Sequence, residues 1–418
     1  MLETSRAIPQ FGALILAWAE TLAQWSDDPS GLTCAFMSAA HRQTAAQLAH
    51  WMQEAGMQVQ VDAVGNVVGR YLSHDAGART LLTGSHYDTV RNGGKYDGRE
   101  GILLPIAVVR HLHLRGERLP FHLEVIAFSD EEGVRFNSTF LGSSAVAGLF
   151  DMALLDQVDA DGMTMRSALA QAGHDVAAIN GIARDPAQLL GFVEVHIEQG
   201  PVLLTRGLPV GIVTSIAGSC RYQIALRGTA GHAGTTPMTM RRDAAVAAAE
   251  IILAVERRCG QGESLVGTVG QLQVPNGSVN VIPGACQLSL DIRAADDIVR
   301  DAAVADVLRE IDAICAARTI DVSIREVMKV PAAPCAPWLM AQLGTATQRA
   351  GVPVLELPSG AGHDAMLMAR ITDVAMLFTR CGNGGISHNP LETMTAEDAQ
   401  LSALVFLDFL RNFVVPVG

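Results

Sequence analysis

The first half of the chain alternates segments of helical periodicity with short strand-like runs, and this alternation restricts the fold more than any other feature of the sequence. Apolar residues recur at helical spacing over 41–55 and 101–114. Strand-like runs stand at 57–61, 80–83 and 123–128. Strands that alternate with helices form βαβ units, so we expect a largely parallel sheet covered by helices on both faces.

The pattern changes near residue 212. From there the segments read β-α-β-β-α-β, at 213–227, 241–258, 265–274, 279–293, 297–317 and 320–327. Pro275-Asn276-Gly277 indicates a hairpin between the two middle strands. This order is typical of a ferredoxin-like α+β module. We therefore predict an α/β fold with a mixed sheet, in which a discontinuous domain (1–212 and 331–418) carries a ferredoxin-like domain (213–330) as an insertion.

Charge and cysteine usage exclude several classes of protein. The 418 residues include 30 Lys and Arg against 43 Asp and Glu, a net charge of −13, which disfavours nucleic-acid and anionic-membrane surfaces. The apolar run at 11–19 is about half as long as a membrane span, and no cleavage site follows it. Seven cysteines without a CxxC pair indicate free thiols in a reducing cytoplasm.

Potential metal ligands stand where four strand segments end. They are His86 with Asp88, Asp97 in a glycine-rich loop, Glu131 with Glu132, His196, and His388 after the run at 374–379. Open α/β sheets bind ligands at the carboxyl ends of their strands. Mixed N and O donors suit Zn²⁺ or Mn²⁺, and one shared Asp would give two ions about 3.5–4 Å apart. Each motif alone also fits a hydrogen-bonded loop, and His363 fits either a pocket wall or a plain turn.

Seven blocks of sequence resemble one family closely, in the same order along nearly the whole chain. They are GSHYDTVRNGGKYDG (84–98), SDEEGVRF (129–136), EVHIEQGP (194–201), GTAGHAGTTPM (228–238), NVIPGA (280–285), SGAGHDA (359–365) and GGISHNP (384–390). The blocks are similar to those of the M20 metallopeptidase superfamily, and within it of the hydantoinase/carbamoylase amidases. That branch includes N-carbamoyl-L-amino-acid hydrolases, β-ureidopropionases and allantoate amidohydrolases.

The resemblance implies a site with two divalent ions, Zn²⁺ or Mn²⁺. It places His86 and His196 on different ions with Asp97 as the bridge, and Glu132 and His388 complete the ligand set. Glu131 would be the general base, and Asp88 would orient His86. A histidine at 196 matches the amidase branch, whereas the related peptidases tend to carry a carboxylate there. The inserted domain would be the lid and the dimerisation domain.

The resemblance also implies a substrate pocket. Arg221, His232, Asn280 and Arg293 match the family's substrate-binding positions, and Gln199, Gly360 and Ala361 would complete the pocket. A ureido acid presents a carboxylate, which suits a bidentate arginine, and a ureido group, which suits amide side chains. His232 would stabilise a developing oxyanion. The alternative is that the two arginines are salt-bridged strand residues and that Asn280 caps a turn.

These observations predict a cytoplasmic, homodimeric di-metal amidohydrolase. It would act on C–N bonds other than peptide bonds, in linear amidines or ureido amides, and release ammonia and carbon dioxide. The loop 87–99 looks more like that of the allantoate amidohydrolases than that of the carbamoylases. Other readings are an N-carbamoyl-L-amino-acid hydrolase or β-ureidopropionase, more remotely an M20 peptidase or aminoacylase, and a non-catalytic scaffold with a dead site.

Overall fold

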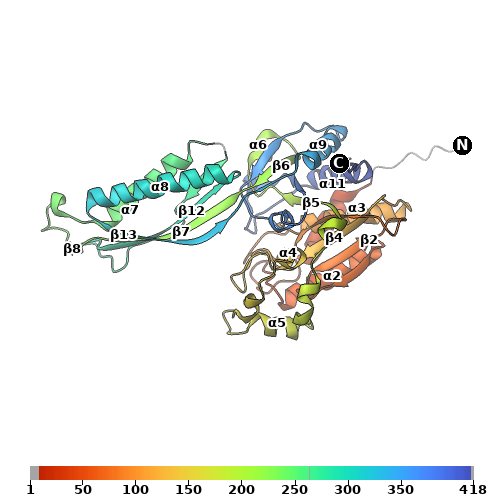
Figure 1. Ribbon diagram of the computed structural model, residues 1–418, viewed down its shortest axis with the longest axis horizontal. Helices are drawn as coiled ribbons and strands as arrows, with labels where there is room; N and C mark the ends of the chain where they lie inside the picture. Colours follow the sequence, from red (N-terminus) through yellow and green to blue (C-terminus); the bar gives the residue numbers. More distant parts are fainter. Residues whose placement is uncertain (1–8, 263, 416–418) are drawn as a thin grey trace. The chain divides into compact units, whose positions relative to one another are not determined.

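The computed structural model describes residues 9–262 and 264–415, and the chain divides into two compact units. Unit 1 comprises Met1–Thr214, Cys335–Leu357 and His363–Gly418, and unit 2 comprises Ser215–Pro334 and Pro358–Gly362. The short segment 358–362 therefore belongs to unit 2, which no feature of the sequence indicated. Figure 1 shows the elements of both units.

The first sheet is parallel at its centre and antiparallel at its sides. Its order is β1-β2-β4-β3-β5-β16-β6-β14, with β15 beside β6. The strands are β1 (Gln58–Val61), β2 (Val67–Tyr71), β3 (Thr80–His86), β4 (His122–Phe128), β5 (Leu189–Ile197), β6 (Val210–Ile216), β14 (Ala333–Pro334), β15 (Glu356–Ser359) and β16 (Val374–Thr379). Adjacent members of the central run β4-β3-β5-β16 are parallel, and every residue of these four strands is buried. Parallel strands covered on both faces need such continuous burial. The mixed α/β fold is confirmed.

Long helices cover this sheet in unit 1. They are α1 (Phe11–Leu22), α2 (Ala39–Glu54), α3 (Glu100–Leu114), α9 (Pro337–Arg349) and α11 (Ala396–Arg411). Helix α1 packs on α3 and α11, and their apolar faces join one large core. The shorter elements are α4 (Leu141–Val146), α5 (Met165–Gln171), α6 (Val202–Arg206), α10 (Ala365–Met368), η1 (Met152–Asp156), η2 (Val176–Gly181), η3 (Pro186–Gln188) and η5 (Asn383–Gly385).

Unit 2 is a second, antiparallel sheet with two helices on one face (Figure 1). Its elements are β7 (Gly218–Arg227), β8 (Gly231–His232), η4 (Met238–Met240), α7 (Ala244–Cys259), β9 (Leu265–Thr268), β10 (Leu272–Gln273), β11 (Val281–Ile282), β12 (Ala285–Ala294), α8 (Asp297–Arg318) and β13 (Asp321–Val330). The sheet order is β10-β12-β7-β13, with β9 beside β12, and a core of its own lies between the sheet and the helices. The main elements follow the order that the sequence pattern predicted.

Three sequence predictions about strands are wrong in detail. The strand expected over 265–274 is split into β9 and β10. The strand expected over 213–227 is broken at Ala217 into β6 and β7, which belong to different sheets. The strand expected over 279–293 begins only at Ala285, because Val281 and Ile282 pair with β8 instead. Pro283 has no N–H for a ladder bond, which explains why the chain leaves one pairing and joins another at this point.

The structure also bears on the expected membrane spans and on the expected state of the cysteines. Among the described residues, no helix is long and apolar enough to cross a membrane. All seven cysteines are buried free thiols, as the sequence predicted.

Candidate metal centre

The candidate ligands converge because four parallel strands end at one edge of the sheet. His86 is the last residue of β3, and His196 is the last but one of β5. Strands β3 and β5 are neighbours although about 100 residues separate them along the chain, and the two imidazole rings lie 5.8 Å apart. Glu131 and Glu132 follow β4, and His388 follows β16.

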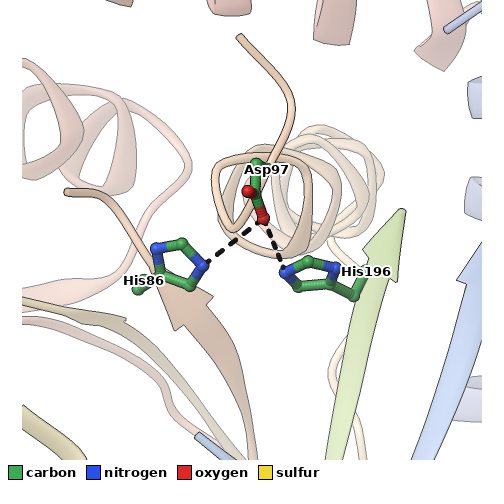
Figure 2. A group of neighbouring side chains, drawn as sticks. All are labelled: His86, Asp97 and His196. Atoms are coloured by element: carbon green, nitrogen blue, oxygen red, sulfur yellow. Dashed lines mark ion pairs between the residues drawn. The ribbon is translucent and has the colours of Figure 1, made fainter. Parts of the chain in front are cut away.

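Asp97 lies between the histidines, in the loop that leads into α3. Its Oδ1 is 3.7 Å from Nε2 of His86 and 3.4 Å from Nε2 of His196 (Figure 2). Figure 2 shows both rings turned toward this carboxylate from their separate strands. The other oxygen, Oδ2, lies 3.1 Å from Nε2 of His388. One buried carboxylate therefore faces three imidazoles.

The contacts form two ligand groups that share Asp97. The first is His86, Asp97 and His196, and the second is Asp97, Glu132 and His388. In each group the candidate ligand atoms lie within 4.8 Å of one another. Oε1 of Glu132 is 3.3 Å from Nε2 of His388, which closes the second group.

This grouping corrects the expectation that His86 and His196 hold different ions. Both of their Nε2 atoms approach the same oxygen of Asp97, so the two histidines lie in one group. The physical reason is strand order, because β3 and β5 are adjacent in the sheet whereas His388 arrives from a loop beyond β16. The sequence does not encode this adjacency locally.

Asp88 connects His86 to the pair of glutamates. Its Oδ1 lies 3.3 Å from Nδ1 of His86. Its two oxygens also accept hydrogen bonds from the backbone N–H groups of Glu131 (3.0 Å) and Glu132 (3.1 Å). A single buried carboxylate thus orients the imidazole through its second nitrogen and fixes the backbone of both glutamates.

The electrostatics of the site follow from burial and close pairing. Burial alone would raise the pKa of Asp97, but hydrogen bonds with His388 and His86 hold it well below its usual range. Burial lowers the pKa of His196 to about 4, so its imidazole is neutral at neutral pH. Burial raises the pKa of Glu131 well above its usual range; the charge of His86 opposes this effect and that of Glu132 adds to it.

The residues present fit divalent cations. Three imidazoles with two carboxylates form a mixed N and O donor set that suits Zn²⁺ or Mn²⁺. In the part of the chain that the structure describes, Asp97 and Glu132 form ion pairs only with histidines and none with lysine or arginine. Cations would balance this buried negative charge.

Two residues that the sequence treated as pocket candidates contact this centre. Gln199 has a left-handed backbone (φ 55°), and its Nε2 donates to Asp97 Oδ1 at 3.1 Å. His363 is buried, with its ring 4.5 Å from that of His196. His363, His196 and Glu194 form a further cluster of possible ligands. Glu194 lies two residues before His196 in β5, and the sequence analysis gave it no role.

The candidate pocket residues of unit 2 form two groups. Arg221 and Arg293 both bond the carboxylate of Asp291, and Nη1 of Arg293 donates to the carbonyl of Gly360 at 2.9 Å. Arg221, Arg293 and Gly360 line a cavity of about 610 Å³. These contacts match the salt-bridged alternative for the arginines, although both side chains also face open volume.

His232 and Asn280 form the second group, where β8 pairs with β11. The carbonyl of Asn280 accepts from Ala233 N at 2.9 Å, and Ser278 Oγ donates to the Asn280 side chain at 3.0 Å. His232 is exposed, and its Nδ1 accepts from Gly234 N at 3.0 Å. Ala361 lies in the short segment of unit 2, where its N–H donates to Ser359 Oγ.

Comparisons with known proteins show the family to which the chain is similar. The model of peptidase family M20/M25/M40 matches residues 82–412, a range that contains all five candidate ligands. Allantoate deiminase of Arabidopsis thaliana is 41% identical over 424 residues, which cover 94% of this chain and 80% of that protein. N-carbamoyl-L-amino acid amidohydrolase of Geobacillus stearothermophilus is 38% identical over 385 residues, which cover 92% and 94%. The crystal structure of an amidase of the hydantoinase/carbamoylase family from Burkholderia multivorans matches with a TM-score of 0.90 at 32% identity, covering 97% of this chain and 98% of that one.

Proposed function

Because the chain belongs to the peptidase family M20/M25/M40 and, within it, to the hydantoinase/carbamoylase amidases, we propose that it hydrolyses the carbamoyl C–N bond of a ureido acid and releases ammonia and carbon dioxide. It is a hydrolase of C–N bonds other than peptide bonds, in keeping with the relatives reported above. The observation that carries the proposal is the convergence of three histidines on Asp97, beside the Glu131–Glu132 pair.

Two divalent ions, Zn²⁺ or Mn²⁺, would occupy the two ligand groups. His86, His196 and Asp97 would hold one ion, and Asp97, Glu132 and His388 the other. When bound, such ions would lower the pKa of a coordinated water molecule toward neutral pH and would polarise a carbonyl group. This donor set on a shared carboxylate supports the assignment.

Glu131 is the proton-transfer residue in this mechanism. It accepts a proton from the attacking water and returns it to the leaving nitrogen, which then departs as neutral ammonia and not as an amide anion. Asp88 keeps the backbone of Glu131 in place through the hydrogen bond at 3.0 Å. A carboxylate whose pKa burial has raised holds a transferred proton more readily than an exposed one.

Most of the groups that recognise the substrate lie in unit 2, and Gln199 lies in unit 1. Arg293, with Arg221 nearby on the same cavity, binds the carboxylate of a ureido acid. Asn280 and Gln199 bond the ureido group, and His232 stabilises the developing oxyanion. Gly360 and Ala361 complete the wall of the pocket. Unit 2 acts as lid and dimerisation domain of a cytoplasmic homodimer.

Allantoate is the substrate that we propose. The loop 87–99 resembles that of allantoate amidohydrolases, and the identity to the Arabidopsis allantoate deiminase, 41%, exceeds the 38% to the Geobacillus N-carbamoyl-L-amino acid amidohydrolase. The second candidate function is that of an N-carbamoyl-L-amino-acid hydrolase, because relatives with that activity are also similar to this chain. A β-ureidopropionase, which also hydrolyses a ureido acid, belongs with this second candidate. His196 and Gln199 argue against a peptidase or aminoacylase.

The test is ammonia release from a panel of ureido acids, with dipeptides as controls. We expect kcat/KM for allantoate to exceed that for N-carbamoyl-L-methionine, because a site built to bond a second ureido arm rejects an analogue without it. A ratio below one would contradict the allantoate assignment and favour the second candidate. Cleavage of dipeptides alone would contradict both. A purified protein with neither activity nor stoichiometric metal would support the alternative of a non-catalytic scaffold.

A further inference from the structure

Glu392 links the two loops that carry Asp97 and His388. Its side chain is buried, with 3% of its surface exposed. Oε1 accepts hydrogen bonds from the backbone N–H groups of Tyr96 (2.9 Å) and Asp97 (3.2 Å). Oε2 accepts one from Ser387 Oγ at 2.7 Å. One carboxylate therefore joins the Asp97 loop to the residue that precedes His388.

Ser387 extends this link to the ligand itself. Its hydroxyl lies 3.4 Å from Oδ2 of Asp97, the oxygen that faces His388, and it accepts from Gln199 Nε2 at 3.3 Å. His388 adopts a left-handed backbone with φ 54°, which costs energy for a residue other than glycine and needs support from its surroundings. The hydrogen bond from Glu392 N to Asn389 O (3.0 Å) closes the turn that directly follows His388.

Gly94 shows how closely the Asp97 loop packs on Glu392. A Cβ at position 94 would lie 2.1 Å from Oε1 and Cδ of Glu392. The backbone of Gly94 is not left-handed, so the glycine is required by space and not by its dihedral angles. Neighbouring Gly93 has no such contact, since its nearest atoms belong to Val90 at 3.1 and 3.2 Å.

We propose that Glu392 is a positioning residue that fixes the separation of Asp97 and His388, and thereby sets the affinity of the Asp97–Glu132–His388 group for its cation. The proposal rests on the proposed metal-dependent function. About 290 residues of chain lie between the two loops, so a link that orders them beforehand removes an ordering cost from cation binding. Groups that orient ligands typically change metal affinity or activity about 10- to 100-fold when they are lost.

The test measures Zn²⁺ binding by the metal-depleted full chain, by competition with a chromophoric chelator, together with bound zinc per chain. We expect Glu392→Ala to weaken one of two zinc sites by about 10- to 100-fold. Turnover with zinc should fall through kcat, with KM nearly unchanged. Glu392→Gln should keep most of the affinity, because its amide oxygen can still accept from both backbone N–H groups.

Asp62→Ala is the matched control. Asp62 also accepts three hydrogen bonds, two from the backbone N–H groups of Val64 and Asn66 and one from the Asn66 side chain, but it contacts no candidate ligand. We expect this variant to lower the melting temperature and to leave both zinc sites as in the wild type. An equal loss of zinc affinity in Asp62→Ala and Glu392→Ala would overturn the positioning role.

Gly94→Ala tests the proposal without removing the carboxylate, and it serves if Glu392→Ala fails to fold. It should weaken the same zinc site because the new methyl group displaces Glu392, whereas Gly93→Ala should change it little. Gly94→Ala combined with Glu392→Ala should be no worse than Glu392→Ala alone, because the clash has gone. Full zinc affinity in Gly94→Ala would overturn the proposal. A separate outcome concerns the proposed function itself. If the wild type binds no zinc, or if Asp97→Asn binds as much zinc as the wild type, the metal-dependent function is wrong.

Discussion

Asp97 uses its two oxygens for different partners, and this division organises the candidate centre. Oδ1 faces His86, His196 and the amide of Gln199, while Oδ2 faces His388. Asp97 therefore belongs to both candidate ligand groups. The proposed hydrolysis assigns different roles to two adjacent glutamates: Glu132 would bind a cation and Glu131 would transfer a proton.

Glu131→Gln should separate these two roles. Glutamine keeps the shape of the side chain but cannot accept the proton, so turnover should fall on the order of 10²–10⁴-fold while bound metal per chain stays unchanged. Elemental analysis and ammonia release measure the two quantities on one sample. Loss of metal in proportion to activity would mean that Glu131 is a ligand and that Glu132 is the base.

At the scale of elements, close approach between helix and sheet sets the position of the Asp97 loop. Helix α3 begins three residues after Asp97, and its second residue, Gly101, packs against the sheet. A Cβ at position 101 would lie 2.1 Å from the carbonyl oxygen of Val195 in β5 and 2.7 Å from Cβ of Ser85 in β3. The helix therefore touches the two strands that carry His86 and His196.

Gly101→Ala should destabilise the protein even though alanine favours helices. Overpacking at such a contact costs about 1–3 kcal/mol or more, which outweighs the gain of roughly 1 kcal/mol in helix propensity. Urea unfolding followed by circular dichroism measures the change in unfolding free energy. Gly181→Ala is the control, because nothing lies within 4 Å of its Cβ and it should change stability by less than about 0.5 kcal/mol. A neutral Gly101→Ala would show that α3 can move away from the sheet without cost.

At the scale of the whole molecule, the candidate metal ligands and most of the candidate substrate-binding residues lie in different units. All five candidate metal ligands and Glu131 lie in unit 1, whereas His232, Asn280, Arg221 and Arg293 lie in unit 2. Each unit has its own hydrophobic core. If the proposed roles are right, a substitution at His232 should impair substrate binding without disturbing the candidate metal ligands of unit 1.

Complementation between inactive variants tests the proposed role of unit 2 in a homodimer. Glu131→Gln and His232→Ala should each be inactive alone. If His232 serves the partner subunit's site, mixed dimers contain one intact site, and random exchange should restore about a quarter of the wild-type activity. Ammonia release after mixing measures the recovery, and native mass spectrometry of the mixture checks that subunits have exchanged. Exchange without recovery would show that His232 serves its own subunit or no site at all.

The sequence by itself determined the features that depend on near neighbours along the chain. Largely apolar runs identified the buried strands at 123–128 and 374–379, and the candidate ligands were found because they stand within or after strand-like runs. The β-α-β-β-α-β order of unit 2 was readable for the same reason, since helical and strand periodicities extend over only a few residues.

Only the tertiary structure decided how distant segments meet. Strand order placed His86 and His196 on one oxygen of Asp97, against the expectation that they hold different ions. Glu392 gave no signal in the sequence. Its partners are the backbone N–H groups of Tyr96 and Asp97, which lie almost 300 residues away and which any residue except proline could supply. Such contacts depend on packing between elements and on loop conformation. Neither can be predicted from the periodicity of a short segment of sequence.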